Sequence, residues 1–393
     1  QIRYHAGSQP SQYCCTFIAG GGNSPRVGHA VGPVIRAGSG TAIRFEHTSF
    51  IDELGKGLYT RGAELSFYEC LFSRLAIGME VVDTSVRVDE CFFVDVFPGG
   101  DASDNDGIYL HGSGQMTVTN SVFAIGGDDG IDTLSSEPLI ENCIIRGWQD
   151  KGVSVFHGAP VVKDCLIAGN GIGITAKGDA TRLDVINTTI VDHQIYGIWI
   201  RNKYNDPDAV IELFMVNTIV WDVPTLIRND YPQRWGLIHL RWCDLQDLQG
   251  TLPPAGPELD HVIEADPGFI DPAGHDYRLL LGSPCIDRSD PQTTPLPDDV
   301  DLAGQPRLVG PAVDMGAYEF RLPGDLDVDG DVDLLDFARF QQCFTGPAGP
   351  APAGMGAQPE ALPGLCRLAD TDEDRDVDLL DFLRFALEFT GPG

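Results

Sequence analysis

A short motif returns at nearly constant spacing along most of this 393-residue chain. Its central position holds a small residue, usually preceded by a polar residue and followed within two positions by Phe, Ile, Val or Leu. The small residues are Thr48, Cys70, Cys91, Ser121, Cys143, Cys165, Thr188, Thr218 and Cys243. The steps between them are 22, 21, 30, 22, 22, 23, 30 and 25 residues. A repeat of about this length, built of short β-type runs and turn residues, indicates stacked coils, and the two longest steps indicate loops that leave the stack.

A second column of residues supports the same register. Gly-Ile or Gly-Val pairs follow the turns of successive coils at Gly107, Gly130, Gly152, Gly173 and Gly197. The runs between the turns are too short for helices and are rich in β-branched residues. This pattern resembles the right-handed parallel β-helix, the fold of pectinases, phage tailspikes and many bacterial surface proteins. The resemblance implies an all-β solenoid with ladders of like residues inside it.

The charge of the chain excludes some partners. Its 58 acidic and 26 basic residues give a formal charge of −32, which argues against binding to nucleic acid or to anionic membrane surfaces, because both need clustered Lys and Arg. No apolar run reaches the roughly 20 residues of a membrane span, so we expect no span. No signal segment opens the chain, and we interpret Gln1 as a processed or truncated start. We expect an extracellular or cell-surface protein.

The composition divides the chain into three parts. Residues 1–262 carry the solenoid period. Residues 263–322 contain strings such as Asp266-Pro267-Gly268-Phe269 and Asp314-Met315-Gly316-Ala317-Tyr318-Glu319. They resemble the choice-of-anchor segment that follows β-helices in secreted planctomycete proteins, and we expect them to cap the open end of the stack. Within this segment Arg278 and Arg307 are expected to hold loops together. Residues 323–393 form an acidic tail.

The ten cysteines need two explanations. Those of the inward column are expected to act as small apolar fillers, although stacking leaves disulfides open for Cys70–Cys91 and Cys143–Cys165. Cys343 and Cys366 flank a Pro/Gly/Ala-rich insert outside the solenoid, and we expect a disulfide between them in an oxidising compartment.

Two acidic loops in the tail have calcium-loop spacing. Acids occupy positions 1, 3, 5, 9 and 12 of the first loop, with Gly330 at position 6, where a tight turn needs positive φ. The second loop starts 45 residues later and has Arg375 at the glycine position. A non-glycine residue there costs about 1 kcal/mol, so we expect the second site to bind calcium more weakly. The expected ligands are Asp325, Asp327, Asp329, Asp331, Asp333 and Asp336, then Asp370, Asp372, Asp374, Asp376, Asp378 and Asp381.

Each loop runs through Leu-Leu-Asp-Phe into an expected helix, at 337–344 and 382–389. Asp in place of Glu at position 12, and the lack of a helix pattern before either loop, resemble the type I dockerin repeat of cellulosomal enzymes. The resemblance implies a small α-helical domain that binds two calcium ions and docks to a cohesin-like module, a surface scaffold or another copy of the chain.

Acidic residues also gather on neighbouring coils of the solenoid, at Asp104, Asp106, Asp128, Asp129 and Asp150. The strings 105–108 and 127–131 resemble two catalytic motifs of the polygalacturonase family. The resemblance implies Asp129 as general acid, with Asp106 and Asp128 activating water for inverting hydrolysis. The chain departs from that family where it has Asp150-Lys151-Gly152 and Trp199-Ile200-Arg201 instead of Gly-His-Gly and Arg-Ile-Lys.

The same residues allow two other interpretations. Lyases with this fold use Lys or Arg as the base and calcium to acidify the α-proton of the sugar, and Lys151 and Arg201 are the candidates here. Alternatively, the acids form a structural turn ladder, neutralised by Lys151 or by a further calcium ion between Asp104 and Asp150.

Two functions therefore stay open. From the sequence we favour a secreted surface or matrix protein with a calcium-dependent docking module, with a structural or adhesive role in a filament or layer. The alternative is a polysaccharide-degrading enzyme, either a hydrolase or a calcium-dependent lyase, tethered through its tail.

Overall fold

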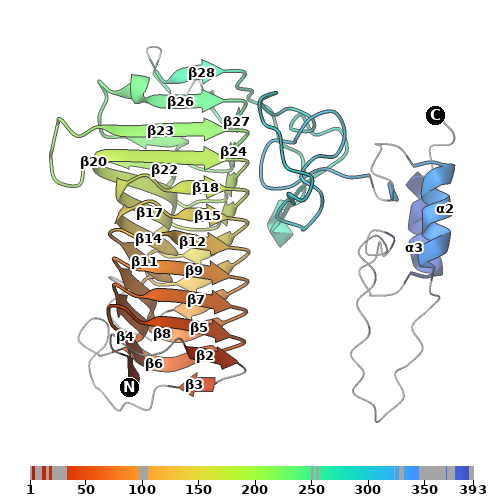
Figure 1. The fold of residues 1–393 in the computed structure, drawn as a ribbon. Helices are drawn as coiled ribbons and strands as arrows, with labels where there is room; N and C mark the ends of the chain where they lie inside the picture. Colours follow the sequence, from red (N-terminus) through yellow and green to blue (C-terminus); the bar gives the residue numbers. More distant parts are fainter. Residues whose placement is uncertain are drawn as a thin grey trace, which may run out of the picture.

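The computed structural model describes residues 2–4, 11–14, 17–19, 33–96, 105–248, 252–253, 256–322, 324–326, 332–344, 369 and 377–388. Through residue 260 the described strands pair in parallel, each with the equivalent strand of the coil before and the coil after (Figure 1). The expected solenoid of parallel strands is confirmed.

Every complete coil contributes to three faces of the solenoid. The first face holds β1 (Ile2–Tyr4), β4 (Ile35–Ala37), β11 (Ile108–His111), β14 (Ile131–Ser136), β17 (Lys151–Gly158), β22 (Tyr196–Arg201) and β25 (Ile227–Asn229). The second holds β2 (Ser11–Cys14), β5 (Ala42–Glu46), β7 (Glu64–Tyr68), β9 (Ser85–Asp89), β12 (Met116–Thr119), β15 (Leu139–Glu141), β18 (Val161–Lys163), β23 (Ile211–Val216), β26 (Ile238–Arg241) and β28 (Glu258–Asp260).

The third face holds β3 (Phe17–Ala19), β10 (Phe92–Val96), β13 (Val122–Gly126), β16 (Ile144–Trp148), β19 (Leu166–Ala168), β21 (Thr189–Val191), β24 (Ile219–Trp221) and β27 (Asp244–Leu245). Three long strands turn a corner of the coil. β6 (Ser49–Arg61) and β8 (Leu71–Val82) run from the third face to the first, and β20 (Ile172–Ile186) runs from the first to the second.

The repeated small residue marks the corner between the second and third faces. The residue before it adopts a left-handed conformation in every described coil, with φ between 46° and 57°. The residues in this conformation are His47, Glu69, Glu90, Asn120, Asn142, Asp164, Asn187, Asn217 and Trp242. Asn and Asp tolerate that conformation best, which explains the polar residue of the motif. The small residue that follows points inward.

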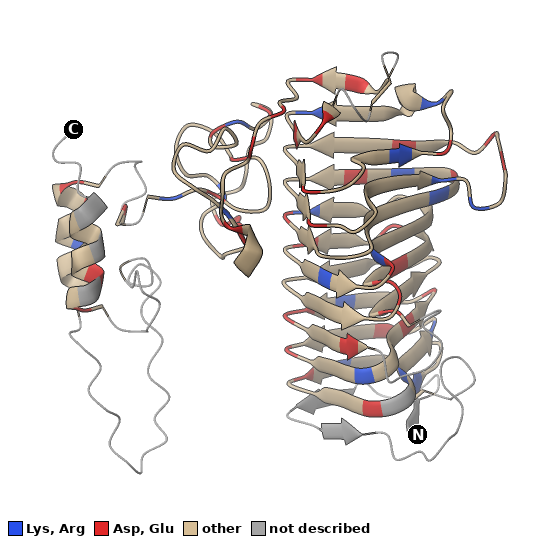
Figure 2. Ribbon diagram, turned by 180° about the vertical axis from the view of Figure 1, so that it is seen from behind, with Lys and Arg blue, Asp and Glu red and all other residues tan. Residues whose placement is uncertain are grey.

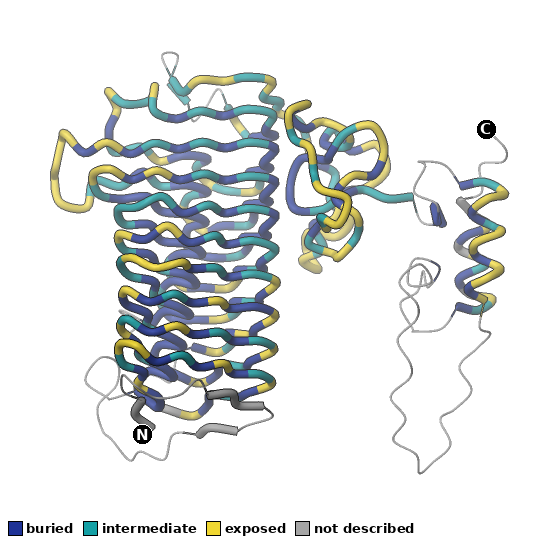
Figure 3. The backbone as a smooth tube through the Cα atoms, in the orientation of Figure 1, coloured by how far each residue is buried: buried dark blue, intermediate teal, exposed yellow. Residues whose placement is uncertain are grey.

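The interior is packed by ladders of like residues. Phe50, Phe72, Phe93 and Phe123 stack at ring-centroid distances of 4.5, 4.5 and 4.6 Å along the solenoid axis. The glycine column is required by close approach between coils, because a Cβ on Gly107 would lie 2.5 Å from the carbonyl oxygen of Gly130. Figure 3 shows the resulting alternation of buried and exposed positions along the coils.

Six cysteines before the tail are free and buried: Cys70, Cys91, Cys143, Cys165, Cys243 and Cys285. The filler interpretation of the ladder cysteines is thereby confirmed, and the two ladder disulfides that the sequence left open are not formed. Cys343 is disulfide-bonded, as expected, while Cys366 lies outside the described residues.

The segment after the solenoid packs on the flank of its last coils. Gly316 N donates to the carbonyl oxygen of Asn217 at 2.8 Å, and Ala317 N donates to Oγ1 of Thr189 at 3.0 Å. Tyr277 packs against the outward side chains of Leu166, Ala168 and Val191 on the third face. The sequence led us to expect this segment over the open end of the stack, whereas these contacts cover an apolar side of it.

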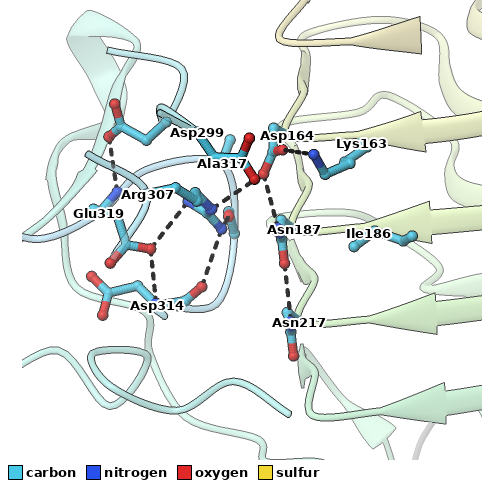
Figure 4. Close-up of polar contacts among 12 residues, drawn as sticks. Lys163, Asp164, Ile186, Asn187, Asn217, Asp299, Arg307, Asp314, Ala317 and Glu319 are labelled. Carbon is cyan, nitrogen blue, oxygen red and sulfur yellow. Dashed lines mark hydrogen bonds and ion pairs between the residues drawn. The ribbon is translucent and has the colours of Figure 1, made fainter. Parts of the chain in front are cut away.

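The flank segment contains an antiparallel pair, β29 (Phe269–Asp271) and β30 (Asp276–Leu279), with a 3-10 turn (Pro272–Gly274) between the strands. Arg307 is 2% exposed and joins this segment to the solenoid: its Nε lies 3.2 Å from Asp164 Oδ1, and its other nitrogens contact Glu319 and the Gly316 carbonyl (Figure 4). The expected loop-holding role of Arg307 is confirmed.

The tail contains α2 (Leu334–Cys343) and α3 (Leu379–Glu388), which lie side by side (Figure 1). Both expected helices are present and begin three residues earlier than expected. At the start of α2, Asp333 and Asp336 form a capping box. Phe340 of α2 packs on Phe385 of α3 at 5.3 Å. No helix in the described part of the chain is long and apolar enough to cross a membrane.

Candidate functional site

Three of the predicted site residues meet where successive coils enter the first face. Asp106 lies two residues before β11 and Asp129 two residues before β14, and the parallel register of these strands stacks the two aspartates. Asp106, Asp128 and Asp129 each bring a carboxylate oxygen within 4.8 Å of the others. Asp104 lies outside the described residues. We call Asp106, Asp128, Asp129 and the neighbouring Asp132 the acidic cluster.

The acidic cluster is mostly buried. Asp106 is 5% exposed and Asp129 is 3% exposed. The backbone N–H of Asp129 donates to Asp106 Oδ1 at 3.3 Å. Burial, followed by the charge of Asp132 and then of the other two aspartates, raises the pKa of Asp106 well above its ordinary value. Buried carboxylates this close need positive charge nearby to ionise together.

Asp132 is a member of the site that the sequence analysis missed. It is the second residue of β14, between the buried Ile131 and Thr133, so its side chain faces outward on the first face. Its Oδ1 is buried and has no hydrogen-bond partner among the residues that the structure describes. Burial, and then the charge of Asp129, raises the pKa of Asp132 to about 6. The alternation of inward and outward residues along β14 was the sequence signal that could have identified Asp132.

Lys151 is held by two carboxylates. Its Nζ lies 2.9 Å from Asp129 Oδ1 and also contacts Asp150. Burial opposes the charged form of Lys151, but Asp129 and Asp150 more than offset it and raise its pKa. Lys151 therefore remains an ammonium group that neutralises part of the acidic cluster, and it is poorly suited to accept a proton.

Lys177 has a different environment and was also missed. Its Nζ donates to Ser154 Oγ at 2.6 Å, and among the described residues it has no carboxylate within ion-pair distance. The register places Ser154 beside Asp132. Lys177 is 6% exposed, and this burial lowers its pKa despite the opposing charges of Asp132 and Asp129. The register of β17 with β20, which sequence spacing did not reveal, brings Lys177 to the site.

Arg201 is the last residue of β22 and neighbours Lys177 in the strand register. Its guanidinium lies over the ring of Trp199, 4.5 Å from the centroid. All five predicted catalytic residues therefore belong to the first face or its entry corner, with Arg201 beyond Lys177. Figure 2 shows basic and acidic residues interspersed along the coils.

The expected calcium ligands of the tail are described only in part. Asp336 and Asp381 are fully buried; Asp336 accepts hydrogen bonds from the backbone N–H groups of Leu326 and Asp333 at 2.6 and 2.7 Å, and Asp381 accepts one from Asp378 at 2.8 Å. Asp325 is buried at the start of the first loop. Asp327, Asp329, Asp331, Asp370, Asp372, Asp374 and Asp376 lie outside the described residues, as do Gly330 and Arg375.

Comparison with known proteins bears on the fold. A family model described as "Right handed beta helix region" matches residues 27–190, which confirms the expected hand of the solenoid. No curated protein matches the chain.

Several solved structures are similar to the chain. Pectate lyase Pel9A is 14% identical with a TM-score of 0.42, and the match covers 73% of this chain and 80% of that one. The periplasmic alginate epimerase AlgG is 10% identical with a TM-score of 0.33, covering 59% of this chain and 62% of that one. The catalytic unit of a thermostable GH87 alpha-1,3-glucanase from Streptomyces thermodiastaticus strain HF3-3 is 13% identical with a TM-score of 0.34, covering 59% and 53%.

Proposed function

We propose that the first face is the active site of a calcium-dependent lyase that cleaves a polysaccharide containing uronic acid. The observation that carries this proposal is the pairing of two features within four successive coils. One is an acidic cluster with an unsatisfied carboxylate oxygen. The other is a buried lysine, Lys177, that has no carboxylate partner among the described residues.

The acidic cluster fits a divalent cation. Calcium takes carboxylate oxygens at about 2.3–2.6 Å, so two ligands of one ion lie at most about 5 Å apart, and the oxygens of Asp106, Asp128 and Asp129 lie within 4.8 Å. Asp132, whose Oδ1 has no hydrogen-bond partner among the described residues, is not one of these three ligands but adds negative charge beside them. Bound there, calcium would offset the carboxylate charge and acidify the proton α to a uronate carboxyl group.

Lys177 supplies the base in this proposal. Its unprotonated Nζ takes the proton from the sugar carbon α to the carboxyl group, and Ser154 holds that nitrogen in place. A carbon–carbon double bond forms, the bond from the neighbouring carbon to the bridging oxygen breaks, and that oxygen leaves with a proton from solvent. The products are an unsaturated uronate end and a shortened chain. No water is consumed.

Two other interpretations fit the geometry less well. Inverting hydrolysis needs its two carboxyl groups about 6.5–9.5 Å apart to admit a water molecule, whereas the oxygens of Asp106, Asp128 and Asp129 lie within 4.8 Å of one another. A purely structural ladder would pair its charges, and Lys151 does so for Asp129 and Asp150. Pairing by Lys151 leaves Asp132 Oδ1 unsatisfied and does not account for Lys177.

The test is to incubate the full chain with polygalacturonate and with alginate, in calcium and after chelation, and to follow the ultraviolet absorbance of the unsaturated product. We expect calcium-dependent cleavage, and a loss of roughly 100-fold or more in kcat for Lys177→Met. Lys163→Met is the matched control, because Lys163 pairs with Glu141 and Asp164 at the far corner of the coil. A wild-type chain that binds calcium yet forms no unsaturated product from any uronate polymer would refute the proposal.

We further propose that the tail binds two calcium ions through the twelve aspartates expected from the sequence, and that it tethers the enzyme outside the cell to a cohesin-like module, a surface scaffold or a second copy. The equivalence of the two repeats supports this proposal: Val332 and Val377, and Phe340 and Phe385, are paired positions of one small core. Sedimentation of the full chain in calcium and in chelator tests the self-association arm. An unchanged monomer in both would leave docking to another protein as the role of the tail.

A further inference from the structure

Arg201 is held in a way that leaves its hydrogen-bond donors available. The guanidinium lies over the ring of Trp199, 4.5 Å from the centroid. The ring of Trp199 is itself held by two contacts. Its Nε1 donates a hydrogen bond to Asp230 Oδ2 at 3.1 Å, and the centroid of the ring lies 5.5 Å from that of Tyr196. A stacked guanidinium keeps its edge N–H groups free for a planar anion such as a carboxylate.

Arg201 also differs from many arginines of the chain in its charge balance. Among the described residues it has no carboxylate within ion-pair distance, although the molecule has a large excess of acid. Arginines that do have such a partner are Arg44, Arg61, Arg74, Arg87, Arg182, Arg228, Arg241, Arg278 and Arg307. Among these, Arg182 also stacks on a ring, that of Phe214 at 4.2 Å, but it pairs with Asp184 on the second face.

A second cation stacked on aromatic rings lies near Arg201. Lys203 Nζ is 5.1 Å from the ring centroid of Phe156 and 5.5 Å from that of Tyr204. Tyr204 is 65% exposed, in the loop that leaves the stack after β22. Phe156 neighbours Lys177 in the strand register, and Lys177 neighbours Arg201. Phe156 precedes Lys177 in the stack and Arg201 follows it, so cations without an ion pair among the described residues, and exposed aromatic surface, surround Lys177.

On the opposite side of the acidic cluster, Lys56 on β6 forms an ion pair with Glu80 on β8, and both side chains are largely buried. Further toward the N-terminus on the same face, Arg36 stacks on the ring of Tyr59, 4.5 Å from its centroid. Stacking on an aromatic ring is therefore shared by two arginines of the first face. What distinguishes Arg201 is its place beside Lys177, with Lys203 two residues further along the chain.

We propose that Arg201, held by Trp199, together with Lys203, forms a binding subsite for a second uronate residue of the substrate, next to the residue that Lys177 deprotonates. This inference rests on the proposed lyase function and adds its substrate specificity: a run of consecutive uronates that extends from the acidic cluster toward β22. The spacing suits this arrangement, because adjacent strands place Lys177 and Arg201 about 4.8 Å apart along the axis. Arg201 binds the carboxylate of the second sugar, and the aromatic rings contact the sugar faces.

The experiment compares Arg201→Gln with Arg182→Gln, which removes a stacked arginine from a different face. Cleavage of polygalacturonate and of alginate is measured for both variants. Binding of short oligouronates and of matched neutral oligosaccharides is measured by calorimetry in the Lys177→Met full chain, with and without Arg201→Gln. We expect Arg201→Gln to raise KM and the oligouronate Kd by roughly 10-fold with little change in kcat, because a charge-assisted contact made equally in ground and transition states is lost. Arg182→Gln should match the wild type.

The outcomes separate this inference from the function on which it rests. If the wild-type chain cleaves no uronate polymer but binds oligouronates in a way that depends on Arg201, the subsite proposal stands and the lyase proposal is refuted. If the chain cleaves uronate polymers and Arg201→Gln leaves KM and the oligouronate Kd unchanged, the subsite proposal is refuted and the lyase proposal stands. Equal binding of neutral and anionic oligosaccharides, or equal effects of the two arginine variants, would also overturn the subsite.

Discussion

Lys177 Nζ donates a hydrogen bond to Oγ of Ser154, on the preceding coil, at 2.6 Å. Ser154 is fully buried and cannot touch a substrate, so in the proposed reaction it positions the lysine. We predict that Ser154→Ala lowers kcat by about 10-fold and leaves KM unchanged, because one hydrogen bond that orients the base is lost. Ser154→Thr, which retains the hydroxyl, should restore most of the rate.

Thr175 offers a matched control for Ser154. It occupies the equivalent position on the next coil and is fully buried, and its Oγ1 has no hydrogen-bond partner among the described residues. Thr175→Val should therefore keep wild-type kinetics and lose no stability, since the hydroxyl it removes is unsatisfied. Equal loss of kcat in Thr175→Val and Ser154→Ala would show that the column acts only through packing.

Calcium binding gives a second prediction, centred on Asp132. Asp132→Asn keeps the shape of the side chain and removes one negative charge from the acidic cluster. We therefore expect the calcium affinity of one class of sites to fall on the order of 10-fold. Titration calorimetry of the full chain measures this class beside the tail sites. Asp184→Asn is the control, because Asp184 pairs with Arg182 on the second face. Identical isotherms for wild type and Asp132→Asn would remove Asp132 from the cation site.

The sequence predicted the solenoid well because its repeat is enforced at every coil. Local steric constraints determine three positions of each coil: the left-handed corner residue, the small inward residue and the glycine. Each of these positions therefore recurs in the sequence at a fixed spacing. The same spacing placed Asp106 and Asp129 one above the other. These features depend on short-range geometry alone.

The missing parts of the site depend on longer-range geometry. Asp132 and Lys177 lie outside the acidic strings, and only the pairing of β14, β17 and β20 brings them together. The pairing of Lys151 with Asp129 and Asp150, which makes it an unsuitable base, is a side-chain contact that spacing does not determine. The flank position of residues 263–320 follows from the outward apolar residues of the third face, which the periodic pattern did not distinguish from inward ones.

The phenylalanine ladder gives a prediction about stability. Phe93 is fully buried between Phe72 and Phe123, with ring centroids 4.5 and 4.6 Å away. Phe93→Ala should lower the free energy of unfolding by about 3–5 kcal/mol, because it leaves a cavity in a stack that cannot collapse without shifting its coils. Phe92→Ala, at a neighbouring position that is 49% exposed, is the control and should cost far less. Urea unfolding compares the two, and equal losses would contradict the ladder as a main source of stability.

The buried contact between the flank segment and the solenoid is predicted to weaken as the pH rises. Arg307 faces Asp164, Glu319 and the nearby Asp314, and Lys163 pairs with Asp164 and Glu141, so these two cations cannot balance every carboxylate (Figure 4). Burial raises the pKa of Glu319 to about 9 despite Arg307, and it raises the pKa of Asp314 to about 7. Glu319 Oε2 is buried without a hydrogen-bond partner among the described residues.

Because the folded state holds these two protons more tightly than the unfolded chain, their contribution is fully present below about pH 4 and is lost as the pH rises through about 7 and then 9. Trp221 and Trp242 pack against the flank segment, so tryptophan fluorescence during thermal unfolding reports on this contact. We expect the wild-type Tm to fall between pH 6 and pH 9, about the range these two pKa values span. Glu319→Gln, whose amide does not ionise, should flatten that fall, and Glu258→Gln at an exposed site should not. A wild-type Tm that rises over this range would mean that Glu319 is already ionised in the folded protein, held by Arg307.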